Sequence, residues 1–549
     1  MSKVIFKACN QGQGSLFPVS QEDKIPSNAP VRPVNQTVDT LDIREITGTC
    51  KSGGTASYHP RMMLKAVLFS CLNSIYSCRK IENALQDRIT FMWLSAMQVP
   101  DHNTINTFRS THLKDTINHI FTQVVLMLVE MGYLSLDVIY TDGTKMESRA
   151  NRYTFVWRKT VEKNKAKLEE KIRRVLEQIE EGIAQDNQPN DDPPAPINSE
   201  ELKRRIAAIN RETLSKESKK ELKILKEKHI PKLQEYEKQL KILANRNSYS
   251  KTDKAATFMR MKDDHMKNGQ LKPAYNVQIG TENQFYTHFD FYPNPTDYLT
   301  FIPFNQGFKK RYGKLPKKEV ADSGYGSEEN YEFMENNSIE PFVKYPFFHK
   351  EQSRSFKSNS FHAQNLSYNV QRDYLVCPIG LQMANVGNST RKSANGYVSQ
   401  TTIYQAENCN CCPLKSQCHQ AEGNRKIEVN HKLNSYRKKA RELLKSKEGL
   451  MYRRKRPIEP EAVFGQTKAN KQYNRFRHFG LDKVKMDFAI FAIAFNIGKL
   501  YNKTQIISKN PKKQSFFDQN EIVFVFILIF IKKNLSVDNL YCNPFRWAA

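Results

Sequence analysis

A carboxylate at the end of a short apolar strand is the first residue of this chain whose position suggests chemistry. The run Val138–Tyr140 combines β-branched and aromatic side chains, which predicts a buried strand. Asp142 and Gly143 follow it, so one carboxylate is expected at the strand tip, beside the positive charges of Lys145 and Arg149. An isolated Asp-Gly pair is usually only a turn. A reactive site is therefore predicted only if other acids join this one.

Two later stretches supply such acids. A second short strand ends at Ala321 and leads Asp322 into a Ser-Gly turn. Further on, Pro460 can occupy the first turn of a helix that carries Glu461 and Lys468. These last two residues are seven positions apart, so they share one helix face. The densest cationic region of the chain flanks this helix and includes Arg456 and Arg475.

The elements around these acids follow the order of an RNase H-like fold, an α/β fold with a mixed sheet. The strand before Asp142 is followed by hairpin strands at 274–280 and 284–292, a helix near 296–312 and the strand before Asp322. A helix, a strand and the helix with Glu461 complete the order. Three carboxylates at one sheet edge repel one another unless a dication neutralises them. We therefore expect Asp142, Asp322 and Glu461 to hold two Mg²⁺ or Mn²⁺ ions for phosphodiester chemistry.

Composition points to the same substrate. The 549 residues contain 85 Lys plus Arg against 57 Asp plus Glu, a net charge of +28, which favours a polyanionic partner such as double-stranded DNA. Lys145, Arg149, Arg456 and Arg475 are the expected backbone contacts near the acids. The longest apolar run, 522–531, is about half the roughly 20 residues of a spanning helix. No signal peptide is recognised, and we expect a cytoplasmic, nucleoid-associated protein with neither a membrane nor a small molecule as partner.

The chain divides into several predicted regions. Apolar residues recur at helical spacing from residue 59, and short helices there allow a helix-turn-helix unit with Arg109 facing DNA, although an ordinary helical bundle fits the pattern equally well. Lys and Glu dominate 159–245 with near-heptad apolar stripes, which predicts an inserted helical hairpin with a solvated charged face. The expected regions are a poorly ordered segment (1–58), a helical DNA-binding domain (59–134), a catalytic domain (135–158, 271–345 and 451–505), a helical coiled-coil-like insertion (159–270), a Cys-rich insertion (346–450) and an unassigned tail (506–549).

Five of the ten cysteines fall within the Cys-rich insertion. Cys409 and Cys412 form a C-x2-C pair, with Cys377 before it and Cys418 after it. Thiolates at this spacing can share a tetrahedral zinc ion, which would pin a subdomain too poor in apolar residues to fold alone. Reduced thiols without metal are the alternative interpretation, and Cys411 and His419 are substitute ligands.

The sequence resembles the DDE transposases of bacterial insertion sequences, in the group with a Tyr-Arg-Glu-Lys third motif. The resemblance covers about residues 40–505. The residues that carry it are YTDGTKMESRANRYTFVW (140–157), YNVQIG (275–280), ADSGYGSEEN (321–330) and EAVFGQTK (461–468), with YHPRMMLKAVLF (58–69), RKIENAL (79–85) and PDHNTINTFR (100–109) in an N-terminal helical domain.

The resemblance implies a role for each motif residue. Asp142, Asp322 and Glu461 would be the metal-binding acids, Lys468 would contact DNA near the cut, and Tyr452 would be the motif tyrosine. The chain departs from the motif because four residues, where the motif has three, separate Arg456 from Glu461. The motif arginine is therefore open among Arg454, Lys455 and Arg456, and Glu459 remains a weaker candidate for the third acid.

The resemblance implies a transposase that binds the terminal inverted repeats of its element, cuts at the ends and joins the 3′-hydroxyls to target DNA. The reaction needs two ends in one complex, so we expect a homodimer on DNA. Two alternatives remain: a catalytically inactive DNA-binding protein derived from a transposase, and a Mg²⁺ nuclease of the same fold that lacks strand transfer.

Overall fold

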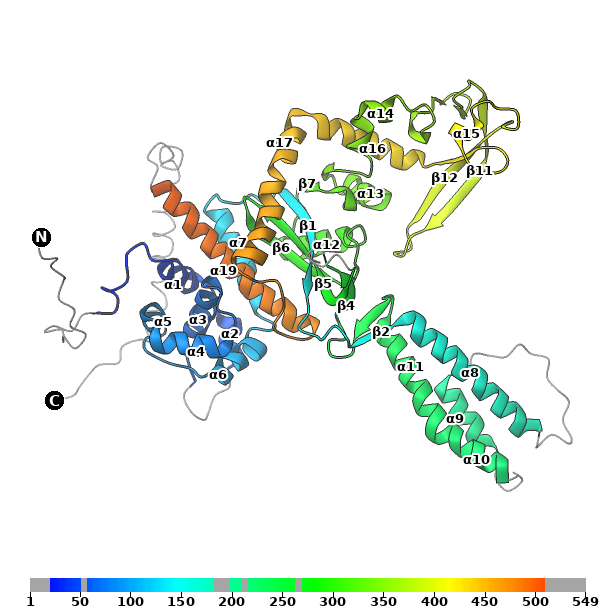
Figure 1. The fold of residues 1–549 in the computed structure, drawn as a ribbon. Helices are drawn as coiled ribbons and strands as arrows, with labels where there is room; N and C mark the ends of the chain where they lie inside the picture. The colour runs from blue at the N-terminus through cyan, green and yellow to red at the C-terminus, as the bar shows by residue number, and fades with distance from the viewer. Residues whose placement is uncertain (1–19, 51–56, 182–197, 210–215, 262–268, 509–549) are drawn as a thin grey trace, which may run out of the picture.

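A mixed sheet lies at the centre of the computed structural model, which describes residues 20–50, 57–181, 198–209, 216–261 and 269–508. The order β4-β5-β1-β7-β8 is extended by β6, which also pairs with β5 (Figure 1). Strands β1 and β7 are parallel, as are β7 and β8, whereas β5 is antiparallel to both β1 and β6. The strands are β1 (Val138–Glu147), β4 (Thr257–Arg260), β5 (Leu271–Glu282), β6 (Phe285–Tyr292), β7 (Lys318–Ala321) and β8 (Glu340–Val343).

This topology confirms the predicted RNase H-like α/β fold. The expected hairpin is β5–β6, and its two-residue turn is formed by Asn283 and Gln284, both with positive φ (56° and 65°). Positive φ at both central residues is the type I′ geometry that matches the twist of two paired strands. Helices α12 (Phe301–Tyr312) and α13 (Glu328–Asn336) connect the later strands. The order of elements around Asp142 and Asp322 is therefore the predicted one.

The N-terminal helices are more extensive than predicted. The expectation of a poorly ordered segment over 1–58 is wrong for its second half, because Val31, Val34 and Val38 of α1 are fully buried. Residues 1–19 and 51–56 lie outside the described residues. The helices are α1 (Val31–Thr40), α2 (Arg44–Gly48), α3 (Pro60–Leu72), α4 (Cys78–Asp87), α5 (Ile89–Leu94), α6 (His102–Thr107) and α7 (Ile117–Glu130).

Helix α19 (Leu481–Ser508) joins these helices to the sheet. It packs against α3 and α7 on one side and β6 on the other, and Figure 1 shows it running between the two groups. Its apolar residues belong to one buried cluster that extends from Ile25 to Leu500 and includes Val277 and Phe289 of the sheet. The N-terminal helices and the catalytic sheet therefore share a continuous core.

The insertion after β1 is a helical bundle that projects from the sheet (Figure 1). It begins with the small β2–β3 ribbon, and Ile172, Ile179 and Leu233 lie in a core of their own. The polar linker expected at 185–199 falls almost entirely on residues that the structure does not describe. The elements are β2 (Phe155–Trp157), α8 (Arg158–Glu181), α9 (Ser199–Ala208), α10 (Lys216–Ile224), α11 (Ile230–Leu243) and β3 (Ser248–Ser250).

The Cys-rich insertion contains a second sheet with the order β13-β12-β11-β10-β9. The insertion ends earlier than the expected residue 450, because Tyr436, Ala440 and Leu444 of α16 pack into the core of the catalytic sheet. Helix α17 follows it. The elements are α14 (Arg354–Lys357), β9 (Tyr368–Asn369), β10 (Tyr374–Val376), β11 (Gln382–Lys392), β12 (Val398–Ala406), α15 (Lys415–Cys418), β13 (Lys426–Val429), α16 (His431–Lys445), α17 (Lys447–Lys455) and α18 (Ala462–Gly465).

None of the helices in the described part of the chain is long and apolar enough to cross a membrane. The apolar run 522–531 and the rest of the predicted tail from residue 509 lie outside the described residues.

Candidate active site

Asp142 lies in the middle of β1, and the expectation that it ends a strand is wrong. The strand continues to Glu147 because its second half stays paired with β5, where Asp142 is opposite Ile279 and Glu147 is opposite Ala274. The Asp142 side chain is 11% exposed. A Cβ at Gly143 would lie 2.3 Å from Gln278 Nε2, so no larger residue fits beside the acid without displacing that amide.

Asp322 follows β7 and comes close to Asp142 through strand register. Strands β1 and β7 are adjacent and parallel, with Tyr140 opposite Val320, and each acid stands two residues beyond this pair. Asp322 Oδ1 accepts a hydrogen bond of 2.8 Å from the Gly324 amide, which fixes the turn after the strand. Because the two strands are neighbours and parallel, carboxylates at the same level lie close together.

Glu461 comes from a π-helical turn, Pro457–Glu461, between α17 and α18. Its side chain is 52% exposed. Glu459, two residues earlier, is buried and points elsewhere: its carboxylate accepts a hydrogen bond of 2.7 Å from the Gln284 amide at the β5–β6 turn. Burial raises the pKa of Glu459. Of the two candidates for the third acid, only Glu461 lies near Asp142 and Asp322 in this structure.

The guanidinium of Arg456 joins the three acids. Its Nη2 lies 3.3 Å from Asp142 Oδ2 and 3.8 Å from Asp322 Oδ2, and its Nη1 lies 3.1 Å from Glu461 Oε1. The Arg456 side chain is 10% exposed. Lys344 stands nearby, and burial together with the charges of Arg456 and Arg453 lowers its pKa. Arg456 therefore acts as the counter-ion of three carboxylates that would otherwise repel one another.

A fourth acid, Asp297, adjoins the site and was missed by the sequence analysis. Its Oδ1 accepts hydrogen bonds of 2.9 Å from both Asn276 Nδ2 and Gln278 Nε2. Tyr325 donates to the other end of the Gln278 amide. Burial raises the pKa of Tyr325 well above its usual range, with Asp297, Asp142 and Asp322 adding to the effect. The polar residues at alternate positions of YNVQIG were the available signal, because a buried strand rarely carries two amides without a polar partner.

Mg²⁺ is a hard cation that prefers oxygen ligands. The carboxylate oxygens of Asp142, Asp322 and Glu461 are ligands of that kind, so these residues fit the expected metal. In this structure the three carboxylates surround the guanidinium of Arg456. Among the described residues, no three His, Cys, Asp or Glu side chains form a group that could hold a metal ion. The carboxylates of Asp142, Asp322 and Glu461 are paired with Arg456 instead.

Four of the basic residues predicted to contact DNA come together where segment 466–480 meets the end of β1. Segment 466–480 runs next to the end of β1, where Glu147 and Arg475 form a parallel bridge. Lys468 Nζ donates to the Lys145 carbonyl (3.3 Å), and Arg475 donates to the carbonyls of Ser148 and Arg149 (3.1 and 2.9 Å). We call Lys145, Arg149, Lys468 and Arg475 the basic strip. The three-dimensional fold brings it together from positions more than 300 residues apart.

Two of the predicted DNA contacts occupy other environments. The expectation that Arg109 faces DNA is wrong in this structure, because Arg109 is 2% exposed and forms a buried ion pair with Asp487 of α19. Arg456 is likewise buried among the acids rather than placed on the strip. Tyr452, the residue expected at the motif tyrosine, packs against Phe342 and donates to Glu448 (2.7 Å), outside the acid cluster.

The four cysteines named as zinc ligands come together. Cys377, Cys409, Cys412 and Cys418 all line one cavity of about 20 Å³. Arg425 donates to the sulfurs of this group, with its Nη1 3.0 Å from Cys418 Sγ and its amide 3.5 Å from Cys409 Sγ. The sulfurs do not form a metal-binding group in the described structure, so the zinc site stays a prediction.

The RNase H-like sheet thus brings Asp142, Asp322 and Glu461 together around Arg456. Two family models match the chain. The Transposase DDE domain matches residues 376–501, which include Glu461 and Lys468, and the Transposase domain (DUF772) matches residues 19–111. No curated protein matches.

These matches confirm the resemblance to the DDE transposases of insertion sequences. They support a transposase function and an enzyme of the nuclease and transposase class, whose family generally uses divalent metal ions and acts on DNA. The N-terminal match begins at residue 19, which agrees with the ordered helices α1 and α2.

Proposed function

We propose that this protein is a metal-dependent DNA transposase that binds the terminal inverted repeats of its own element, cleaves the DNA at the element ends and transfers the strands to a target. The observation that carries this proposal is the convergence of Asp142, Asp322 and Glu461 on the guanidinium of Arg456. Acids on adjacent parallel strands and on a distant helical segment meet at one point, as a phosphoryl-transfer site requires.

Asp142, Asp322 and Glu461 would hold two Mg²⁺ or Mn²⁺ ions, which when bound supply a Lewis acid for the phosphate and an activated water or 3′-hydroxyl. The protein groups position the DNA. Lys468 and Arg475 neutralise phosphates of the bound DNA. The amides of Asn276 and Gln278 hold the Asp297 carboxylate in place by hydrogen bonds.

Arg456 has a defined part in this proposal. Without a dication, its single positive charge offsets part of the repulsion among the three carboxylates, and withdrawal of its side chain would free all three for metal. We further propose that the protein acts as a homodimer on DNA, because the reaction joins two ends in one complex.

The test is strand cleavage on DNA that carries the element ends, with Mg²⁺ and with EDTA. We expect wild-type cutting to require the metal and to be abolished in Asp142→Ala, Asp322→Ala and Glu461→Ala, with DNA binding retained. Glu459→Gln is the matched control on the same helical turn and should keep cutting. Activity retained in any of the three variants removes that acid from the site.

The same assay separates the alternative functions. A wild-type protein that binds the ends and never cuts would be a catalytically inactive derivative of a transposase. One that cuts without joining strands would be a nuclease of this fold.

A further inference from the structure

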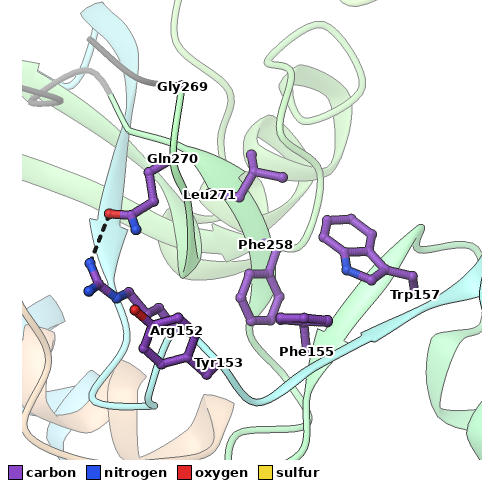
Figure 2. A pocket seen from close by; sticks show the side chains of 8 residues that line it. All are labelled: Arg152, Tyr153, Phe155, Trp157, Phe258, Gly269, Gln270 and Leu271. Carbon is purple, nitrogen blue, oxygen red and sulfur yellow. Dashed lines mark hydrogen bonds between the residues drawn. The ribbon is translucent and has the colours of Figure 1, made fainter. Parts of the chain in front are cut away.

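An aromatic pocket lies where the helical insertion leaves the catalytic sheet (Figure 2). Its cavity measures about 350 Å³, and Arg152, Tyr153, Phe155, Trp157, Phe258 and Leu271 are among the residues that line it. These residues come from β2, the segment before it, and strands β4 and β5. We call this cavity the aromatic pocket. It belongs neither to the acid cluster nor to the basic strip.

Strand alternation explains why aromatic rings face the cavity. Successive side chains of a strand point to opposite faces. Val156 enters the core at the base of the insertion with Val161 and Tyr249, so Phe155 and Trp157 turn together to the other face. There they meet Phe258, with ring centroids 6.1 and 5.9 Å from that of Phe258.

The pocket combines a buried floor with exposed walls. Phe258 is 5% exposed and forms part of the floor, whereas Tyr153 is 68% and Phe155 47% exposed. Leu271 is 39% exposed on the neighbouring strand. The chain thus presents several large apolar side chains side by side in water, an arrangement that marks binding surfaces.

Cations stand at the pocket rim. The Arg152 guanidinium lies 4.9 Å from the Tyr153 ring centroid and donates a hydrogen bond of 3.1 Å to Gln270 Oε1. The Arg260 guanidinium also lies near the rim, because a Cβ built on Gly269, which lines the pocket, would lie 3.8 Å from its guanidinium carbon. Aromatic faces flanked by arginines suit a flat base attached to an anionic backbone.

We propose that the aromatic pocket binds an unpaired nucleobase of the DNA by stacking, with Arg152 and Arg260 facing the adjacent phosphates. This inference rests on the proposed function, since it takes DNA as the substrate. A protein partner would be expected to leave the cationic rim without a role, whereas a nucleotide uses both the rings and the arginines. Base-paired DNA hides its ring faces, so the bound base comes from a single-stranded or splayed segment.

The sheet sets the distance between this base and the cut. Strand β5 runs from Ile279, opposite Asp142, to Leu271 at the pocket. At roughly 3.4 Å per residue, these eight steps span about 27 Å. A DNA strand covers that length in roughly eight nucleotides. The bound base therefore lies well away from the cleaved bond, in DNA that the protein opens or finds open.

Fluorescence anisotropy with the full chain tests the proposal. The probes are an oligothymidylate of about 20 nucleotides, an abasic oligomer of the same length and a duplex. We expect wild type to bind the oligothymidylate more tightly than the abasic oligomer. Tyr153→Leu combined with Phe155→Leu should weaken oligothymidylate binding roughly tenfold, because stacking is lost while apolar bulk remains, and should leave duplex binding within about twofold.

Phe347→Leu, which alters another exposed aromatic residue outside the pocket, is the control and should change neither affinity. Equal wild-type affinity for the oligothymidylate and the abasic oligomer would overturn the inference, as would unchanged binding in the double variant. Duplex binding without oligothymidylate binding would overturn it and leave the transposase proposal intact. A wild-type protein that binds none of the three DNAs would overturn both.

Discussion

At the scale of single residues, the centre of the candidate site is occupied by an arginine. Arg456 contacts all three acids, although they come from two strands and a helical segment. The buried guanidinium attracts the three carboxylates and holds them in place. It also competes with any dication for the same carboxylate oxygens. The same competition suggests how the residue can be tested.

Arg456→Gln should make the stability of the protein depend more strongly on Mg²⁺. Without the guanidinium the three acids repel one another, and we expect a loss of about 2 kcal/mol in metal-free buffer, since Asp322 and Glu461 are partly exposed. Thermal unfolding with and without Mg²⁺ measures the effect. Adding Mg²⁺ should raise the Tm of Arg456→Gln more than it raises the Tm of wild type. Arg454→Gln, which changes an exposed neighbour, is the control and should respond as wild type does. Equal Tm increases in all three proteins would contradict metal binding by these acids.

A second residue at this scale is Glu319 of β7, which is fully buried and accepts a hydrogen bond of 2.9 Å from Thr141. Burial raises its pKa to about 8, so it is protonated in the folded protein at neutral pH. The folded state then holds a proton that the unfolded state, with a carboxyl pKa near 4.5, has released. The contribution of Glu319 to stability is complete below pH 4.5 and is lost as the pH rises through 8.

Glu319→Gln should therefore remove part of the pH dependence of the unfolding free energy. Between pH 6 and pH 9 the wild type should lose about 3 kcal/mol of unfolding free energy through this group, and the variant should lose less. Urea unfolding at the two pH values measures the difference. A variant with the same pH slope as wild type would show that Glu319 is not protonated in the folded protein.

At the scale of elements, the Cys-rich sheet has a small core. Its buried cluster contains Leu375, Met383, Tyr404 and Ile427, with Cys409 among its members. The four cysteines approach one cavity from the end of β10, the loop after β12 and α15. A sheet with so little apolar burial gains stability from a cross-link between these segments, and a shared zinc ion is one such cross-link.

Elemental analysis of the purified protein should find about one zinc per chain. Cys412→Ser should lower the zinc content and destabilise the β9–β13 sheet, seen as faster amide exchange there, with little change in the catalytic sheet. Cys411→Ser is the matched control, because Cys411 is exposed and is not among the residues that line the cavity. Zinc-free protein with unchanged exchange in Cys412→Ser would establish reduced thiols instead.

At the scale of the whole molecule, the N-terminal helices and the catalytic sheet form one packed unit through α19. The ion pair between Arg109 and Asp487 crosses this junction, with both side chains 4% exposed or less. Burial acts to raise the pKa of Asp487, but His478 and Arg109 outweigh it and lower the pKa to about 2. Because the folded pKa lies below the unfolded value of 3.8, the stabilisation is present above pH 3.8 and is lost as the pH falls towards 2.

Removing one partner of this pair should destabilise the whole protein. Asp487→Asn leaves the Arg109 charge buried without its counter-ion, which costs about 3 to 5 kcal/mol. We expect a lower Tm for the N-terminal helices and the catalytic sheet together, and weaker acid sensitivity between pH 4 and pH 2. Circular dichroism during acid and thermal unfolding gives both measurements. A variant in which only the N-terminal helices melt early would contradict a shared core.

The sequence by itself predicted the order of elements around Asp142 and Asp322 and favoured Glu461 over Glu459 as the third acid. These features depend on local periodicity and on motif spacing, which each segment carries in its own residues. The Asp142 strand is longer than predicted, because its second half (143–147) is mostly polar and gives no strand pattern of its own, and it is held by pairing with β5. The N-terminal helices before residue 59 were missed, since their apolar residues become a core only when α3 and α19 cover them.

Only the tertiary structure decided which charges meet. Three arginines illustrate this. Arg109 and Arg456 are buried against acids from other elements, whereas Arg149 lies on the surface beside Phe479. Asp297 entered the site through the amides of a neighbouring strand. Sequence spacing determines which face of an element a residue occupies, whereas the partner on the opposite side depends on how the elements pack, and that partner sets the charge, burial and chemistry of the residue.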